Sequence, residues 1–278
     1  MEPFAARRPQ IAFLLGKPAK SGSIFSQLFE LLRAAGVDIA MHLPHTAPDP
    51  VPPWLFGADL VVNRGLSLDA LIAARRLEDA GVRCCNHIRA TLAVRDRALV
   101  VRRLVGAGLP VPATVEAATW GDLLAAAAGP SVVVKTVDGS LGRGEGVLIA
   151  EPDGLPDEAP FAGPYLIQHR IPADGWDRKL YLAGDHVSGL LKPWSRRTPD
   201  AISKPFSPDS MLVDLSRRVA ATLDLDVCGV DIVVGPGGPM VVDVNPFPGF
   251  KGVPNAACHI ARHLTYALRA SDAGLNLN

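Results

Sequence analysis

The sequence predicts a mixed fold, with a parallel α/β domain at the N-terminus and antiparallel structure beyond it. Apolar runs alternate with helical patterns over residues 1–90, which is typical of a parallel sheet. A strand, a glycine-rich loop and a second strand follow one another over residues 132–147. Two β-branched runs, 227–234 and 240–245, flank a short Gly/Pro turn and predict an antiparallel pair.

Length and composition restrict the class of protein. A chain of 278 residues with 48% hydrophobic residues suits two or three small domains. Equal numbers of acidic and basic residues, 28 of each, argue against a nucleic-acid or membrane surface. The four cysteines show no zinc-binding spacing and are too few for a disulfide scaffold. Because there is no signal peptide and no run of 18 apolar residues, we expect a reduced, cytoplasmic protein.

The N-terminal domain is expected to contain four strands and two helices. The strands are predicted at 11–15, 37–41, 59–63 and 82–85, and the helices at 23–35 and 67–80. Five prolines between 44 and 53 exclude regular structure there. The Ser/Gly loop at 21–23 could bind an anion at a helix N-terminus, but a simple helix cap is the favoured interpretation.

The middle of the chain carries a buried lysine next to a glycine-rich loop. Helices are predicted at 96–107 and 120–128, and a strand at 131–135 ends in Lys135. A lysine on a buried strand is costly to desolvate without an anionic partner. The glycines of residues 139–146 allow backbone N–H groups to approach a phosphate closely, although neither a Walker A nor a Rossmann pattern is present. A long glycine hairpin is the alternative.

The C-terminal half alternates strands with two helices. We expect strands at 165–169, 177–183 and 186–192, a loop at 199–208, and helices at 209–223 and 255–269. Lys179, Lys192 and the pair Arg196–Arg197 form a basic stretch, for which a solvated face is the usual interpretation. Strand alternation places Asp177 and Lys179 on one face, which favours a position in a cleft.

The final strand pair predicts a metal site. Asp231 lies in the first strand, and Asp243 and Asn245 share one face of the second. Three oxygen ligands of this kind suit Mg²⁺, which binds a few carboxylates together with substrate phosphates. Mn²⁺ is an alternative ion. Two surface aspartates at strand ends are the other interpretation, but an acid inside an apolar strand is costly without a partner.

Taken together, these segments resemble the ATP-grasp superfamily, and most closely its RimK-like amino-acid ligase branch. The resemblance covers roughly residues 59–265 and ends on the specific pattern Asp243-Val244-Asn245-Pro246-Phe247-Pro248-Gly249-Phe250. It implies an N-terminal α/β domain (1–90), a central lobe (91–164) and a C-terminal lobe (165–278), with ATP gripped between the two lobes.

The resemblance also assigns roles to residues. Lys135 matches the lysine on the ATP phosphates, and Gln168, His169 and Ile171 fall where a strand borders the adenine. Lys179 and Lys192 fall near the bases that hold the γ-phosphate or an acyl-phosphate. The loop that closes over the phosphates corresponds to Ser140, Gly142, Gly144 and Gly146. The nucleotide-binding aspartate of the Asp-x-Lys strand corresponds to Asp177. The magnesium ligands correspond to Asp231, Asp243 and Asn245.

Two positions depart from the family pattern. Arg97 follows Asp96 where the family usually has lysine, and arginine holds phosphate with a different reach and a planar geometry. His169 follows Gln168 where the family usually has glutamate, so a carboxylate that could hold the nucleotide is lost. Both changes bear on nucleotide preference.

The resemblance implies a ligase that joins a small-molecule carboxylate to an amine, with an amino acid or peptide as substrate. The sequence is also similar to inositol polyphosphate kinases of the same fold, through Asp96-Arg97, Lys135-Thr136, Lys192-Pro193 and Ser203-Lys204-Pro205. A nucleotide-binding regulator without turnover is a third class. Homodimers are common in the family, and the sequence marks no interface for one.

Overall fold

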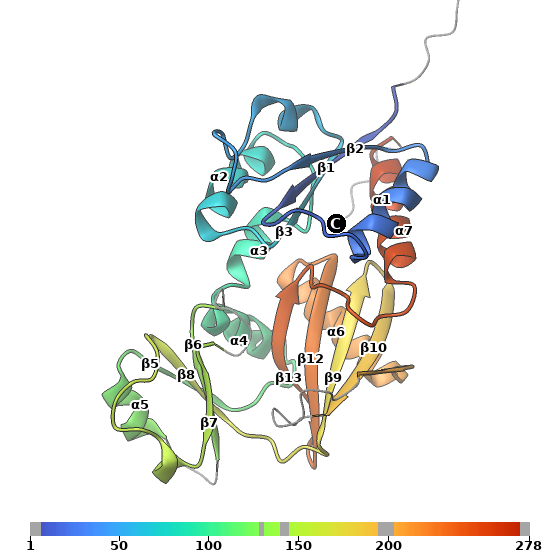
Figure 1. Cartoon of the computed structure of the whole chain (residues 1–278). Helices are drawn as coiled ribbons and strands as arrows, with labels where there is room; N and C mark the ends of the chain where they lie inside the picture. Colours follow the sequence, from blue (N-terminus) through green and yellow to red (C-terminus); the bar gives the residue numbers. More distant parts are fainter. Residues whose placement is uncertain (1–6, 128–130, 140–144, 194–202, 273–278) are drawn as a thin grey trace, which may run out of the picture.

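A computed structural model of the chain describes residues 7–127, 131–139, 145–193 and 203–272, and contains three sheets (Figure 1). The first sheet is parallel, as the alternating pattern predicts, with strand order β2-β1-β3-β4. Its strands are β1 (Gln10–Leu15), β2 (Asp38–His42), β3 (Leu60–Arg64) and β4 (Cys84–Cys85). The helices of this region are α1 (Ile24–Ala34), the 3-10 helix Pro53–Gly57, α2 (Leu68–Asp79) and α3 (Ile88–Ala93).

The central strand β1 is buried on both faces, which explains its uninterrupted apolar sequence. Phe13 packs in a core with α1, whereas Leu14 packs in a second core with α2. The first core also contains residues of the third sheet and of the last helix, so the first sheet shares its interior with the C-terminal part of the chain.

The second sheet is antiparallel, with strand order β5-β8-β6-β7. Its core surrounds Trp120 and Tyr165, whose rings meet edge to face at 5.3 Å. The predicted limit between the central and C-terminal lobes, at residue 165, stays a prediction; β8, which begins there, pairs with β5 and β6. The elements are α4 (Arg97–Gly106), β5 (Thr114–Ala117), α5 (Trp120–Ala126), β6 (Val132–Thr136), β7 (Val147–Ala150), the 3-10 helix Pro152–Gly154 and β8 (Tyr165–His169).

The third sheet is antiparallel, with strand order β11-β10-β9-β12-β13. Apolar side chains of α4 and α6 share one core with this sheet, and those of α1 and α7 share another with it. Figure 1 shows α7, in red, running alongside the blue α1. The elements are β9 (Trp176–Ala183), β10 (His186–Pro193), β11 (Lys204–Phe206), α6 (Ser210–Leu223), β12 (Val227–Gly235), β13 (Gly238–Pro246) and α7 (Ala256–Asp272).

The prediction of a loop throughout 199–208 was wrong for residues 204–206, which form β11. This short strand pairs antiparallel with β10 at the edge of the sheet. Pro205 is tolerated there because an edge strand leaves some of its N–H positions without a ladder partner. The sequence also did not predict α3 or β5, both of which are short.

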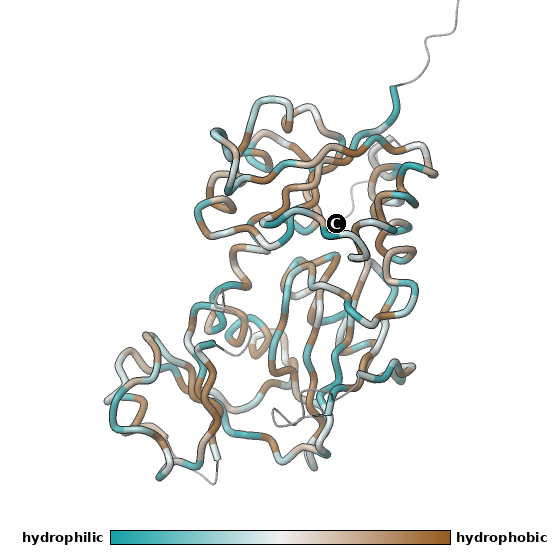
Figure 2. Tube along the Cα trace, viewed as in Figure 1, coloured by the Kyte–Doolittle hydropathy of each residue, from teal (hydrophilic) through white to brown (hydrophobic). Residues whose placement is uncertain are grey.

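Apolar residues concentrate along the strands of the first and second sheets, as Figure 2 shows. Within the described ranges, the helices are too short or too polar to span a lipid bilayer.

Candidate active site

A cavity of about 340 Å³ lies between the second and third sheets. This volume is within the range of small-molecule sites. Eight of the residues singled out from the sequence line it, although they come from both sheets, from α4 and from the connection between β8 and β9. They are Arg97, Lys135, Gln168, His169, Ile171, Asp177, Asp231 and Asp243.

The predicted acid pair lies on the cavity wall formed by the third sheet. Asp231 of β12 and Asp243 of β13 are directly opposite each other in the antiparallel register, and a β-bulge follows Asp231. Asn245 shares a face with Asp243, and its Nδ2 donates a hydrogen bond to Asp243 Oδ2 at 3.2 Å. The structure therefore brings the three oxygen-bearing side chains of the predicted metal site together.

The acid pair meets the requirements of a cation site. Burial raises the pKa of Asp231, and the neighbouring Asp243 adds to this rise, whereas Lys179 opposes it. A divalent cation would relieve the repulsion between the two carboxylates. Two carboxylates and one amide oxygen are hard ligands, which suit Mg²⁺.

Lys179 is engaged with the acid pair. It lies opposite Asp231 on β9, and its Nζ forms an ion pair with the Asp231 carboxylate. Burial, the largest single influence, would lower the pKa of Lys179, but the ion pair and hydrogen bond with Asp231, together with nearby Asp177 and Tyr181, outweigh burial and leave that pKa raised. Lys179 therefore stays an ammonium ion that holds the Asp231 carboxylate in place.

Lys135 crosses from the second sheet to the third. It projects from β6, and its Nζ donates a hydrogen bond to the backbone carbonyl of Val242 on β13, at 2.6 Å. Burial lowers the pKa of Lys135, and the adjacent Asp243 opposes this change. The Lys135 ammonium thus lies on the cavity wall, one residue along the strand from the acid pair.

Arg97 begins α4 and is fixed beside the glycine-rich loop. Asp96 caps the helix by accepting a hydrogen bond from the N–H of Leu99. The Nη1 of Arg97 donates to the carbonyls of Thr136, at 3.0 Å, and Asp138, at 3.3 Å. These contacts place a guanidinium at the point where β6 leads into the loop.

The loop itself is described only at its two ends. Gly146 has a φ of 61°, in the left-handed region that glycine accepts without strain, and its carbonyl accepts a hydrogen bond from Thr136 N–H. Ser140, Gly142 and Gly144 lie outside the described residues.

Gln168 and His169, the last two residues of β8, also line the cavity. The Gln168 side chain is buried and its Nε2 donates to Thr114 Oγ1 at 3.1 Å, whereas His169 is exposed at the rim. Asp177 is partly buried, which raises its pKa, and it lies opposite Lys192 in the strand register. The residue after Lys192, Pro193, lines the cavity, whereas Lys192 does not.

The structure adds Arg64, which the sequence did not single out. Arg64 ends β3, and its Nε donates to the carbonyl of Phe247, 3.2 Å away and two residues beyond Asn245. Its guanidinium carbon lies 5.2 Å from the centre of the Phe25 ring. Among the described residues Arg64 forms no ion pair, and burial lowers its pKa. The only feature of the sequence that could have indicated a role for Arg64 was its position at the carboxyl end of an apolar strand.

The chain is similar to a named relative in sequence and to solved structures in fold. No model of a known protein family matches the sequence. A protein of Stenotrophomonas maltophilia strain K279a, named a probable alpha-L-glutamate ligase, is 30% identical over 228 residues, which cover 73% of this chain and 75% of the relative.

Solved structures share the fold. The RimK domain ATP-grasp protein of Sphaerobacter thermophilus matches with a TM-score of 0.71 at 24% identity, over 92% of this chain and 99% of its own. The ATP-grasp ligase PsnB, in a complex with a phosphomimetic variant of its minimal precursor, Mg and ADP, matches with a TM-score of 0.68 at 18% identity, over 94% of this chain and 99% of its own.

Proposed function

The chain belongs to the RimK-like branch of the ATP-grasp ligases, and from this premise we propose that it joins a carboxylate to an amine through an acyl-phosphate, releasing ADP and phosphate. The observation that carries this proposal is the acid pair Asp231 and Asp243, which lines one cavity with Lys135. Asn245 is joined to this pair by its hydrogen bond to Asp243. The acids of the third sheet provide ligands for a cation, and the lysine of the second sheet provides a positive charge. Binding of a nucleoside triphosphate requires both.

We assign the nucleotide to the cavity between the second and third sheets. Asp231, Asp243 and Asn245 would hold Mg²⁺, or Mn²⁺ in its place, which neutralises charge on the transferred phosphoryl group. Lys135 and Arg97 would contact the phosphate oxygens, since both reach the cavity from the side of the glycine-rich loop. The apolar side chains of Val133, Ile149 and Ile171 would cover the base.

The proposed reaction has two steps. A carboxylate oxygen of the first substrate attacks the γ-phosphorus, and the bond to the ADP oxygen breaks. The amine of the second substrate then attacks the acyl carbon, phosphate leaves, and the amine loses a proton as the amide forms. Lys135 and Arg97 would stabilise the charge that spreads onto the phosphoryl oxygens, whereas Lys179 would act by positioning Asp231.

Arg64 supports an acidic substrate such as an amino acid. Its guanidinium is partly buried and donates a hydrogen bond to the carbonyl of Phe247, in the turn that follows Asn245, which brings it near the proposed metal site. An arginine in such a position can hold a carboxylate through two parallel hydrogen bonds. We therefore propose an amino acid, with glutamate as the first choice because of the named relative, as one substrate.

The function is tested by supplying Mg·ATP with pools of amino acids, amines, sugars and inositol phosphates, while ADP and phosphate are measured separately. A ligase releases both products together, and only when an acid and an amine are both present. Release of ADP without phosphate, together with a phosphorylated product, would establish a kinase instead. If no pool supports turnover, the ligase proposal fails.

The metal assignment is tested with the variants Asp243→Ala and Asn245→Ala. Each should reduce turnover by at least about 100-fold, because a lost ligand weakens charge stabilisation in the transition state. Asp157→Ala, which alters an exposed acid, is the matched control and should keep wild-type activity. Unchanged turnover in both cluster variants, with unchanged circular dichroism, would contradict the assignment.

A further inference from the structure

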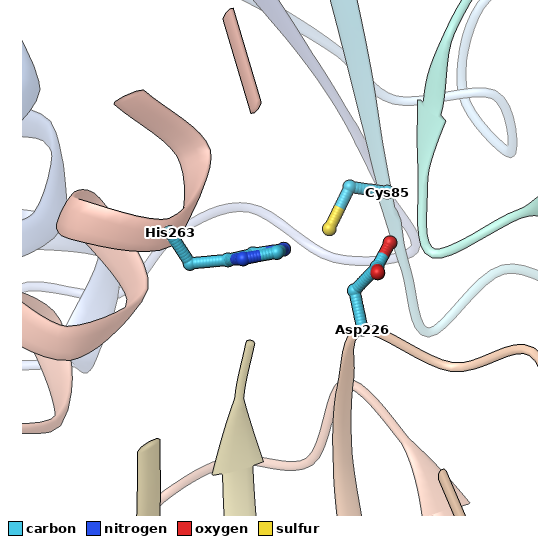
Figure 3. A group of neighbouring side chains, drawn as sticks. All are labelled: Cys85, Asp226 and His263. Carbon is cyan, nitrogen blue, oxygen red and sulfur yellow. The ribbon is translucent and has the colours of Figure 1, made fainter. Parts of the chain in front are cut away.

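A second cluster of ligand-type side chains lies away from the cavity, where the first sheet meets the third (Figure 3). Cys85 ends β4, Asp226 immediately precedes β12, and His263 belongs to α7. Their thiol, carboxylate and imidazole donor atoms all lie within 4.8 Å of one another. Figure 3 shows the three side chains pointing toward one another from these three separate segments.

The imidazole of His263 has a nitrogen that no described residue satisfies. His263 Nε2 is buried and lacks a hydrogen-bond partner. Leaving a buried polar atom without a partner is costly, and such atoms in native structures usually have a specific reason. The imidazole occupies space that the absence of a side chain at Gly184 leaves open, because a Cβ added there would lie 2.5 Å from His263 Nδ1.

The backbone that carries Cys85 is fixed to the backbone that carries Asp226. The side chain of Asn86, which is fully buried, accepts hydrogen bonds from the N–H groups of Asp226, at 2.9 Å, and Val227, at 2.7 Å. Its Nδ2 donates to the Val227 carbonyl at 2.7 Å, and Gly184 N–H donates to the Asp226 carbonyl at 2.9 Å. The donor atoms are therefore brought together by contacts that do not involve the donor atoms themselves.

We propose that Cys85, Asp226 and His263 form a binding site for a borderline-soft divalent cation, with Zn²⁺ as the expected ion. One sulfur, one nitrogen and one oxygen match the ligands that zinc accepts, and water would complete the tetrahedron. Zinc bonds of about 2.0–2.3 Å imply donor separations of roughly 3.5 Å, so the side chains must close by about an ångström. Asp226 is exposed and can make that movement, and it leaves one side of the site open for the ion to enter.

Binding of the cation releases one proton. The Cys85 thiol loses its proton to solvent when its sulfur binds the cation, and the free electron pair of His263 Nε2 fills the second position. Because the thiol is buried, a role as a nucleophile toward a substrate is excluded by access. The set of donors also separates this site from the acid cluster of the cavity, which offers oxygen ligands alone.

The test measures Zn²⁺ and Co²⁺ on the full-length protein. After dialysis against a weak chelator, the wild type should retain one equivalent of Zn²⁺. When Co²⁺ replaces it, a thiolate-to-cobalt absorption band should appear in the near ultraviolet. Asp243→Ala should keep both the zinc and the band, which separates this site from the proposed catalytic metal.

Variants of two proposed ligands and of two other residues of α7 sharpen the result. His263→Gln and Asp226→Asn should weaken Zn²⁺ binding by more than the roughly 10–100-fold that is typical of losing a residue which only supports a ligand. His259→Gln and Cys258→Ser alter α7, the helix of His263, but lie outside the cluster, and these variants should bind Zn²⁺ like the wild type. Cys85→Ser should abolish the cobalt band, and if this variant does not fold, the band in the wild type and its loss in His263→Gln carry the test. No retained zinc, no thiolate band, or equal loss in the control variants would overturn the proposal.

Discussion

At the scale of single residues, Lys135 has a partner that a nucleotide would replace. Its ammonium donates to a neutral carbonyl, that of Val242, although it is desolvated and lies near two acids. A phosphate oxygen is a stronger acceptor than a carbonyl, because the hydrogen bond is then charged on both sides. The position of Lys135 therefore favours the binding of an anion, whose oxygen would replace the Val242 carbonyl as the hydrogen-bond acceptor.

We expect Lys135→Met to raise the KM for ATP by about 10- to 100-fold, since a hydrogen bond to a charged group contributes about 1.5–3 kcal/mol. Methionine keeps the length and apolar character of the side chain, so the fold should be retained. Steady-state kinetics with ATP as the varied substrate checks this. A KM within twofold of the wild type would remove Lys135 from the phosphate site.

Arg64→Gln should affect the KM for the carboxylate-bearing substrate but not the KM for ATP. We expect the KM for the carboxylate-bearing substrate to rise at least about tenfold, because a bidentate contact is lost, while the KM for ATP stays unchanged. Arg75→Gln changes an exposed arginine of α2 and serves as the control. Equal effects on both KM values would show that Arg64 supports the fold rather than a substrate.

At the scale of elements, α3 depends on a carboxylate at its N-terminus. Glu78 accepts hydrogen bonds from the N–H groups of Ile88 and Arg89 and from the His87 ring, and its side chain is only 10% exposed. Burial alone would raise the pKa of Glu78, but these hydrogen bonds outweigh burial and leave it lowered. The carboxylate thus satisfies donors that a helix start leaves without partners.

Glu78→Gln should therefore lower the free energy of unfolding by about 1–2 kcal/mol at pH 7. Because the folded-state pKa of Glu78 is lowered, this contribution is present above the unfolded-state pKa and is lost as pH falls through the folded-state value. Denaturant unfolding of both proteins across pH 3–7 checks this. Glu158→Gln, an exposed change, should show no such trend.

Elements with strong local patterns were predictable from the sequence, and elements formed by their neighbours were not. The strands around Asp231 and Asp243 were predictable because β-branched runs flank a glycine turn, and the structure confirms the antiparallel pair. The register that sets Asp231 opposite Asp243 comes from the structure. Residues 204–206 look like a loop because of Pro205, and only the edge of β10 makes them a strand. The helix α3 has six residues, too few to show a helical period.

At the scale of the whole molecule, Asn86 joins the first sheet to the third. Its amide forms three hydrogen bonds to the backbone of Asp226 and Val227, some 140 residues away along the chain. Contacts over this sequence separation cannot be predicted from local sequence patterns, because nothing in the sequence of either segment indicates which distant segment it contacts. The same is true of Arg64 with Phe247, which are 183 residues apart, and of the Cys85 cluster.

Asn86→Ala should reduce the free energy of unfolding by about 2–4 kcal/mol, since it leaves buried N–H groups without acceptors. Amide hydrogen exchange at Asp226 and Val227 should accelerate more than exchange in the second sheet. Gln27→Ala, an exposed change on α1, is the control and should lie within about 0.5 kcal/mol of the wild type. Unchanged exchange at Val227 would show that other contacts hold the two sheets together.

The packing of α7 against α1 has a consequence for the order of events during synthesis. The core that holds Phe13 and Phe25 also contains Ile260 and Leu264, which the ribosome adds more than 200 residues later. The first sheet and α1 therefore emerge with apolar residues of this core uncovered, and these residues are covered only when almost the whole polypeptide has been made. Until then the nascent chain presents an apolar surface to which a chaperone can bind, and the core around Phe13 is complete only once the last helix has been made.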